Sequence, residues 1–416
     1  MKNYDLVVIG GGPAGMSAAV AAYDNGAKNI LILERDDKLG GVLNQCVHNG
    51  FGLQRFKENL AGPEYAEKCA VEVGKRDIDV FLSTMVLEIS EDHTIKAMNS
   101  EYGVFALKPK AIILAMGCRE RSRGALNIAG TRPAGIYSAG TAQRYVNIEG
   151  YLPGKDVVIL GSGDIGLIMA RRMTLEGAKV HAVCEIMPFS SGLKRNIVQC
   201  LNDFDIPLYL NHTIIDIEGN ERVTGVTIAE VNPADKKPIK GTEKHFDCDT
   251  VLFSVGLIPE NELTTKAGIE MSPRTKGAAV NQYRETSYKG IFACGNVLHV
   301  HDLVDFACEE AEIAGKSAAK YALGELTTNN SFSIVNGKNI GYVVPQKISK
   351  PAENVKIYFR VSNVYKNVTF KIKDGDKVVL ERKKASVAPG EMETLILTAD
   401  LLNSVESDVL TVEMEA

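Results

Sequence analysis

The sequence of 416 residues lacks the features that mark several large classes of protein. It contains no apolar run close to the roughly 20 residues that a membrane-spanning helix needs. Its eight cysteines include no C-x-x-C pair, which disfavours an iron–sulfur cluster, a structural zinc and a thioredoxin-like dithiol. Its net charge of -5 provides no excess of cations for nucleic acid. We therefore expect neither a membrane span nor a nucleic-acid partner.

No signal peptide is expected at the N-terminus, because the glycines of Gly10–Gly15 interrupt the first apolar stretch. We therefore expect a cytoplasmic protein, a setting that disfavours structural disulfides. The length suggests about two to four domains. An apolar content of 45% supports large cores.

What the sequence does contain is two glycine-rich turns of one pattern, Gly10–Gly15 and Gly161–Gly166, which begin 151 residues apart. A short apolar run, typical of a buried parallel strand, precedes each turn. A glutamate follows the first glycine of each turn by 24 residues, as Glu34 and Glu185. Strand, turn, helix and acid thus recur twice at the same spacing.

Each part of this pattern meets a need of dinucleotide binding. The first glycine allows a tight turn, the second lets a pyrophosphate approach the backbone, and the third lets helix and strand pack closely. The N-terminus of the following helix offers N–H groups and a positive dipole end to the phosphates, and the glutamate can accept hydrogen bonds from ribose hydroxyls. Two such turns predict two dinucleotides and electron transfer between them. The alternative is a degenerate nucleotide fold that binds nothing.

The order of motifs predicts an α/β protein with two Rossmann-like nucleotide-binding domains, the second inserted into the first, and a C-terminal all-β sandwich-like domain. The first domain is expected over residues 1–120 and 280–327, with a small β-meander at 78–110. The second is expected over 121–279. Residues 331–416 contain short runs rich in valine, isoleucine, threonine and tyrosine between turns, which is typical of a β-sandwich. A packing or docking role is favoured for this last domain.

Over residues 1 to about 325 the sequence resembles the FAD-dependent pyridine nucleotide-disulfide oxidoreductase superfamily. The resemblance depends on both glycine turns and on three further motifs, Ala115–Gly117, Val255–Gly256 and Gly295–Asn296. The family usually has Gly-Asp at the last of these, and its aspartate binds the ribityl chain of FAD. Asn296 can still hydrogen-bond a hydroxyl but carries no charge.

Two stretches, Gly40–Gly52 and Arg132–Gln143, resemble a narrower group. This group comprises the NAD/FAD-binding subunits of multi-subunit amino-acid and amine dehydrogenases and of glycerol-3-phosphate dehydrogenase-like systems. Disulfide reductases of the superfamily carry a redox cysteine pair, whereas here Cys46 has no second cysteine in its loop. The β-rich C-terminus also replaces the usual dimerisation domain. The resemblance therefore implies a hetero-oligomer with a flavin-dependent dehydrogenase subunit, rather than the usual homodimer.

The resemblance implies FAD in the first domain and NAD(H) in the second, with a hydride passing between nicotinamide and flavin. Val86 would contact FAD through its main chain. The implied FAD-binding residues are Gly10, Gly12, Pro13, Ala14, Gly15, Glu34, Gly41, Val42, Val86, Ala115, Gly117, Gly295 and Asn296. The implied NAD-binding residues are Gly161, Gly163, Asp164, Ile165, Gly166, Glu185 and Gly256.

Glu185 favours NAD over NADP. A carboxylate at this position binds the free 2′-hydroxyl of the ribose and repels a 2′-phosphate. The next residues, Ile186–Pro188, supply no arginine that could bind such a phosphate.

Cys46 and His48 are the candidate catalytic residues. Cys46 is either a redox-active or charge-transfer thiolate near the flavin, or a small residue that packs the loop. His48 either polarises the flavin edge and takes up a proton, or is a hydrogen-bonded loop histidine. His299 and His301 are expected to be structural. The spacing of these histidines fits no standard ligand pattern, so no metal site is predicted.

These features predict an NAD(H)-linked FAD oxidoreductase. The preferred hypothesis is the electron-transfer subunit of a larger dehydrogenase that oxidises a small hydroxy acid, amine or glycerol phosphate. One alternative is a stand-alone NADH oxidase or peroxidase that uses Cys46. Another is a non-catalytic scaffold that FAD stabilises.

Overall fold

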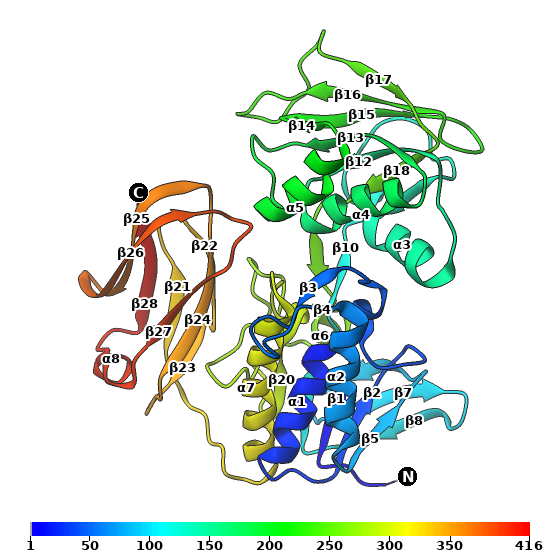
Figure 1. Cartoon of the computed structure of the whole chain (residues 1–416). Coiled ribbons are helices and arrows are strands. Elements are labelled where there is room, and N and C mark those ends of the chain that lie inside the picture. Colours follow the sequence, from blue (N-terminus) through cyan, green and yellow to red (C-terminus); the bar gives the residue numbers. More distant parts are fainter. Residues whose placement is uncertain (1) are drawn as a thin grey trace. The chain divides into compact units, whose positions relative to one another are not determined.

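A computed structural model describes residues 2–416, which form two compact units (Figure 1). One unit comprises the chain up to Cys118 together with Pro259–Ala416, and the other comprises Arg119–Ile258. The chain passes from one unit to the other at β10 (Cys118–Glu120) and returns at β19 (Leu257–Pro259). Among the described residues, no helix combines the length and apolar character that crossing a membrane requires.

The first unit contains a five-stranded parallel sheet in the order β20-β9-β1-β2-β5. The central strands are buried on both faces, which explains their continuous apolar sequence. The strands span Leu6–Ile9 (β1), Ile30–Leu33 (β2), Ile78–Phe81 (β5), Ala111–Leu114 (β9) and Ile291–Ala293 (β20).

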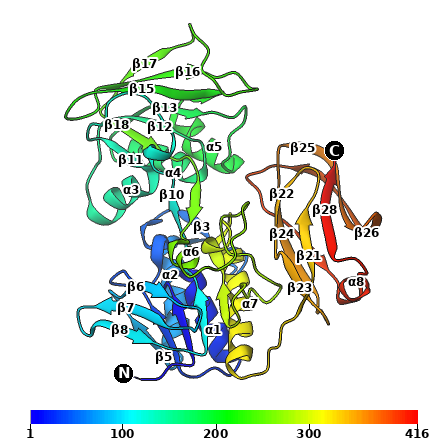
Figure 2. The same cartoon turned by 180° about the vertical axis from the view of Figure 1, so that it is seen from behind.

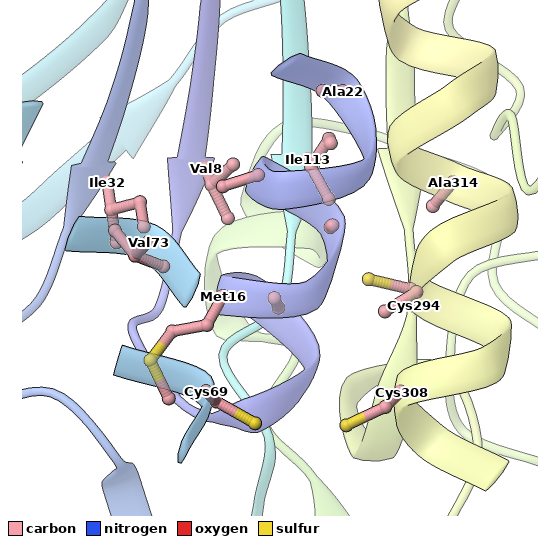
Figure 3. Packing of buried hydrophobic residues seen from close by; sticks show 14 of the residues in the cluster. Val8, Met16, Ala22, Ile32, Cys69, Val73, Ile113, Cys294, Cys308 and Ala314 are labelled. Carbon is pink, nitrogen blue, oxygen red and sulfur yellow. The ribbon is translucent and has the colours of Figure 1, made fainter. Parts of the chain in front are cut away.

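Three helices accompany this sheet: α1 (Pro13–Asp24), α2 (Gly62–Gly74) and α7 (Val304–Ala322). In Figure 3, Val8 and Ile113 of the strands lie in one apolar cluster with side chains of all three helices. The helices α1 and α7 pack closely, because a Cβ on Gly315 would lie only 2.1 Å from the carbonyl oxygen of Ala18. Short elements nearby are β3 (Asn49–Phe51), β4 (Leu60–Ala61) and α6 (Glu262–Lys266).

The predicted β-meander is an antiparallel sheet of β6 (Met85–Ile89), β7 (Ile95–Asn99) and β8 (Gly103–Leu107), which Figure 2 shows from behind. Its buried side chains pack in a second cluster with the other face of the parallel sheet. The run at 78–81, which was expected within the meander, instead pairs with β2 as β5 of the parallel sheet.

The second unit repeats the first arrangement in a parallel sheet ordered β11-β18-β12-β13-β14. Its central strand β12 (Asp156–Leu160) leads into α4 (Asp164–Leu175), as β1 leads into α1. The other strands are Ile136–Ser138 (β11), Lys179–Glu185 (β13), Leu208–Leu210 (β14) and Thr250–Phe253 (β18). The helices α3 (Ala139–Arg144) and α5 (Lys194–Cys200) and an antiparallel sheet complete the unit, with strands His212–Glu218 (β15), Gly225–Glu230 (β16) and Lys244–Asp247 (β17).

The C-terminal residues form two sheets, β23-β21-β28-β25-β26 and β22-β24-β27, around one apolar cluster. The strands are Asn330–Asn336 (β21), Ile340–Val344 (β22), Lys347–Ser349 (β23), Val355–Val361 (β24), Tyr365–Asp374 (β25), Lys377–Val387 (β26), Glu393–Leu397 (β27) and Val409–Glu415 (β28), with α8 at Ala399–Ser404. Two Rossmann-like parallel sheets and a C-terminal β region confirm the predicted fold class.

Candidate functional site

The turn between β1 and α1 has one open glycine between two packed ones. Gly10 has a φ of +105°, and a Cβ there would lie 2.4 Å from the carbonyl oxygen of Ala115. A Cβ on Gly15 would lie 1.8 Å from the carbonyl oxygen of Gly10. No atom lies within 4 Å of the Cβ position of Gly12. The turn is therefore closely packed below and open above, as the approach of a pyrophosphate requires.

Glu34 is fixed beside this turn. Its side chain is buried, and its Oε2 accepts a 2.6 Å hydrogen bond from the N–H of Gly11. Its Oε1 accepts a second bond, of 2.8 Å, from the N–H of Asp36. A carboxylate held by two backbone donors keeps lone pairs for a ribose hydroxyl, so the residues present fit the adenosine part of FAD.

Several predicted FAD residues meet at the carboxyl ends of β1, β9 and β20. A Cβ on Gly41 would lie 3.3 Å from the Cα of Gly12, and one on Gly295 would lie 2.7 Å from the Cβ of Ala14. Ala115 contacts Gly10 as described above. Strands, loop and helix α1 thus bring residues from four separate parts of the sequence to one edge of the sheet, where open α/β sheets bind ligands.

The remaining predicted FAD residues have different surroundings. Val42 is 61% exposed, and no atom lies within 4 Å of the Cβ position of Gly117. Val86 is buried in β6. The amide oxygen of Asn296 accepts a 3.0 Å hydrogen bond from the N–H of His301, which fixes the orientation of the amide group. The contacts of these residues with FAD stay predictions.

The turn between β12 and α4 has the same construction as the first turn. Gly161 has a φ of +99°, and a Cβ there would lie 2.0 Å from the carbonyl oxygen of Ser254. A Cβ on Gly166 would lie 2.6 Å from the carbonyl oxygen of Gly161. The nearest atom to a Cβ on Gly163 is 3.6 Å away, an ordinary contact distance. A Cβ on the middle glycine would thus fit without a clash, although it would contact Ser254 and Ser191.

Glu185 is held beside the second turn much as Glu34 is held beside the first. Its Oε2 accepts hydrogen bonds from the N–H and the hydroxyl of Ser162, at 3.0 and 2.6 Å, and its Oε1 accepts one of 3.0 Å from the N–H of Met187. Asp164, at the start of α4, accepts hydrogen bonds from the N–H of Leu193 and the amide of Asn196, at 2.8 and 2.6 Å. Its carboxylate therefore holds the neighbouring loop.

A family model for pyridine nucleotide-disulphide oxidoreductases matches residues 4–318, which span both turns. The chain belongs to this family. It is accordingly an FAD-dependent pyridine-nucleotide oxidoreductase, in a family that binds FAD and NAD(P)H.

Three curated proteins are similar to the chain over most of its length. Hydrogen cyanide synthase subunit HcnB of Pseudomonas protegens is 25% identical over 75% of this chain and 69% of its own length. An alkyl hydroperoxide reductase subunit of Staphylococcus aureus is 27% identical over 71% of this chain and 54% of its own length. NADH dehydrogenase of Bacillus subtilis is 29% identical over 78% of this chain and 58% of its own length. The chain thus spans little more than half the length of two of these relatives.

Solved structures share the fold. Thioredoxin reductase of T. acidophilum is 23% identical, with a TM-score of 0.63, over 78% of this chain and all of its own. A NAD-dependent persulfide reductase of A. fulgidus is 18% identical, with a TM-score of 0.61, over 96% of this chain and 76% of its own. The second likeness extends into the C-terminal β region.

Cys46 and His48 lie in and just after the loop that contains Gly41. The thiol of Cys46 donates a 3.3 Å hydrogen bond to the carbonyl oxygen of Val42, and its own carbonyl accepts one of 2.8 Å from the N–H of Gly62 at the start of α2. The Nδ1 of His48 is 3.1 Å from the carbonyl oxygen of Asn49. Their catalytic roles stay predictions.

The structure brings together two thiols that no local spacing in the sequence relates. Cys69 of α2 and Cys308 of α7 are both buried, and Figure 3 shows their side chains pointing toward each other in the core of the first unit. The hydroxyl of Tyr65 donates a 3.3 Å hydrogen bond to the sulfur of Cys308. Interactions with Cys69 and Tyr65 lower the pKa of the Cys308 thiol below its ordinary value, although burial opposes this shift.

A second feature without any local sequence signal is a buried polar cluster around Glu310 of α7. Four N–H donors surround this carboxylate, and its side chain is fully buried. Oε1 accepts from Arg284 Nε and His299 Nε2 at 3.0 Å each, and Oε2 accepts from the N–H of Gly295 at 3.1 Å and from His301 Nε2 at 3.0 Å. Burial raises the pKa of Glu310, but its electrostatic interactions with His299, Arg284 and His301 outweigh this and hold it well below its ordinary value.

The ligand atoms of Glu310, His299 and His301 lie within 4.8 Å of one another, close enough to suggest a metal site. However, each oxygen of the Glu310 carboxylate already accepts two N–H hydrogen bonds. Each imidazole must carry its proton on Nε2 to donate, so this nitrogen has no lone pair for a metal. The fully buried guanidinium of Arg284 would also repel a cation. This arrangement fits a hydrogen-bonded cluster better than a metal centre.

His299 makes the stability of the fold depend on pH. Burial lowers the pKa of His299 from 6.5 to about 4, so the folded protein keeps this ring neutral where the unfolded chain takes up a proton. The free energy of unfolding should therefore fall as pH falls from 6.5 to 4, by about 3 kcal/mol, since one pKa unit corresponds to about 1.4 kcal/mol. Urea unfolding at several pH values measures this fall in the free energy of unfolding. A His299→Gln variant should lose this part of the slope, and an unchanged slope would contradict the assignment.

Proposed function

We propose that the chain exchanges a hydride between NAD(H) at the second turn and FAD at the first. The observation that carries this proposal is the repeated turn, in which a Cβ on Gly12 or Gly163 would meet no clash while a Cβ on the flanking glycines would collide with backbone. When bound, the two cofactors supply the redox chemistry. The residues of the chain bind and orient them.

In this proposal the N–H groups at the starts of α1 and α4 bind the pyrophosphates. Glu34 and Glu185 bind the adenosine riboses, since each is already oriented by two or three donors. Asn296 donates to the ribityl chain from its amide nitrogen: the oxygen already accepts from His301, and the nitrogen, which donates one hydrogen bond of 3.6 Å to the sulfur of Cys118, has a second N–H. NAD is preferred over NADP, because the carboxylate of Glu185 would repel a 2′-phosphate.

We further propose that the chain is the electron-transfer subunit of a larger dehydrogenase that oxidises a small hydroxy acid, amine or glycerol phosphate. Two of the similar proteins are themselves named as subunits, of hydrogen cyanide synthase and of alkyl hydroperoxide reductase. The loop of Cys46 offers no second cysteine for disulfide reduction. The partner subunit would then choose the substrate.

Anaerobic titration with NADH tests the hydride exchange. The purified chain should carry FAD, and NADH should bleach its visible absorbance, whereas NADPH should need a concentration at least about tenfold higher. A yellow protein that NADH fails to bleach would refute the exchange. Rapid oxygen or peroxide consumption by the isolated chain would instead favour a stand-alone oxidase, and co-purification with a flavin-dependent dehydrogenase subunit would support the partner.

A further inference from the structure

Residues of the C-terminal β region bind the segment 295–303, which joins β20 to α7 and contains Asn296. Arg360 of β24 reaches this segment with its Nη2 atom, which donates a 3.0 Å hydrogen bond to the carbonyl oxygen of Val300 and pairs with the carboxylate of Asp302. The other oxygen of Asp302 accepts a 2.6 Å hydrogen bond from the N–H of Met392. Residues on both sides of His301 are thus fixed by the β region.

Arg360 is itself held in place. Its Nε donates to the hydroxyl of Tyr342 at 3.1 Å, and its Nη1 donates to the carbonyl oxygen of Pro389 at 3.0 Å. Most of its side chain is buried, as is that of Asp302, with exposed fractions of 16% and 20%. A buried arginine with four acceptors is rigid and geometrically specific, unlike a surface ion pair.

Within the segment, this restraint reaches the flavin motif directly. The N–H of His301, which lies between the two residues that Arg360 binds, donates to the side-chain oxygen of Asn296. The N–H of Gly295 donates to Glu310, which also binds His301. The orientation of the Asn296 amide therefore depends on where His301 lies, and that position depends on Arg360.

We propose that the C-terminal β region is part of the FAD site and that Arg360 is its positioning residue, which acts through His301 on Asn296. This inference depends on the proposed function, because it assigns Asn296 to FAD. The β region would then be required for tight flavin binding, in addition to any docking role.

The test is an Arg360→Met variant of the full chain. We expect its dissociation constant for FAD to rise at least about tenfold and the visible spectrum of the bound flavin to shift. A Lys356→Met variant is the matched control, because Lys356 also links β24 to α7, through Glu309 at 2.8 Å, and its ion pair is with this glutamate and not with a residue of segment 295–303. This control should bind FAD like the unmodified protein.

A double-variant cycle separates positioning from general destabilisation. If Arg360 acts through Asn296, then Arg360→Met should weaken FAD binding much less in an Asn296→Ala background. Additive losses would overturn the inference. Asp302→Asn gives a milder variant of the same contact if Arg360→Met folds poorly. If the unmodified chain binds FAD, and the Arg360→Met and Asp302→Asn variants bind it equally well, this inference fails while the proposed function stands. If the unmodified chain binds no FAD, this inference and the proposed function both fail.

Discussion

Replacing Gly12 with alanine should give a folded protein that has lost its FAD. The backbone at Gly12 has φ and ψ of -71° and 177°, which alanine adopts freely, and no atom lies within 4 Å of the new Cβ. The methyl group would instead occupy the space that the pyrophosphate needs. We expect the affinity for FAD to fall at least about 100-fold, or about 2.7 kcal/mol. Flavin absorbance of the purified variant and FAD titration of the apoprotein measure this loss.

Gly163→Ala is the matched variant for the second turn. Its backbone is also extended, with φ and ψ of -66° and 163°, and the nearest atom to the new Cβ is 3.6 Å away. This protein should remain yellow but no longer be bleached by NADH at concentrations that bleach the unmodified chain. Gly15→Ala provides the contrast, because its Cβ would lie 1.8 Å from a carbonyl oxygen and should disrupt the fold itself.

The outcomes separate binding from folding. Circular dichroism should be unchanged in the Gly12 and Gly163 variants and altered in the Gly15 variant. If Gly12→Ala retained FAD, the first turn would not bind the pyrophosphate, and if Gly163→Ala were reduced normally by NADH, the second turn would not bind the nicotinamide cofactor.

The sequence was sufficient to predict these two turns because their requirements are local. Strand, three glycines, helix and acid lie within Leu6–Glu34 in the first motif and Asp156–Glu185 in the second, and each part has its own physical reason. The same holds for the short runs rich in valine, isoleucine, threonine and tyrosine, and the turns between them, that predicted the β region. The β5 strand was assigned to the meander, because a short apolar run does not reveal which neighbour it will pair with.

The Glu310 cluster could not be predicted because it depends on tertiary packing. Its donors come from residues 284, 295, 299 and 301, which belong to a loop, a turn and the segment before α7. In the sequence Glu309 and Glu310 are adjacent and chemically identical. Which face of α7 packs against the rest of the unit decides that Glu310 is buried and Glu309 is partly exposed. The meeting of Cys69 with Cys308 has the same origin.

That difference predicts very different results for the same substitution at the two positions. Glu310→Gln replaces one carboxylate oxygen with an NH₂ group, which donates and would therefore face other N–H donors. The fully buried Arg284 would also lose its counter-ion. Removing one partner of a buried ion pair costs about 3–5 kcal/mol of unfolding free energy. Chemical denaturation measures this loss.

Glu309→Gln is the control from the next position of the helix. Its carboxylate pairs with Lys356 at 2.8 Å, but the two side chains are 45% and 24% exposed, so the loss should stay within about 1 kcal/mol. A double variant, Glu310→Gln with Arg284→Met, should recover part of the stability, because it removes the unpaired guanidinium. Equal losses at positions 309 and 310 would show that Arg284 and the histidines do not depend on this carboxylate.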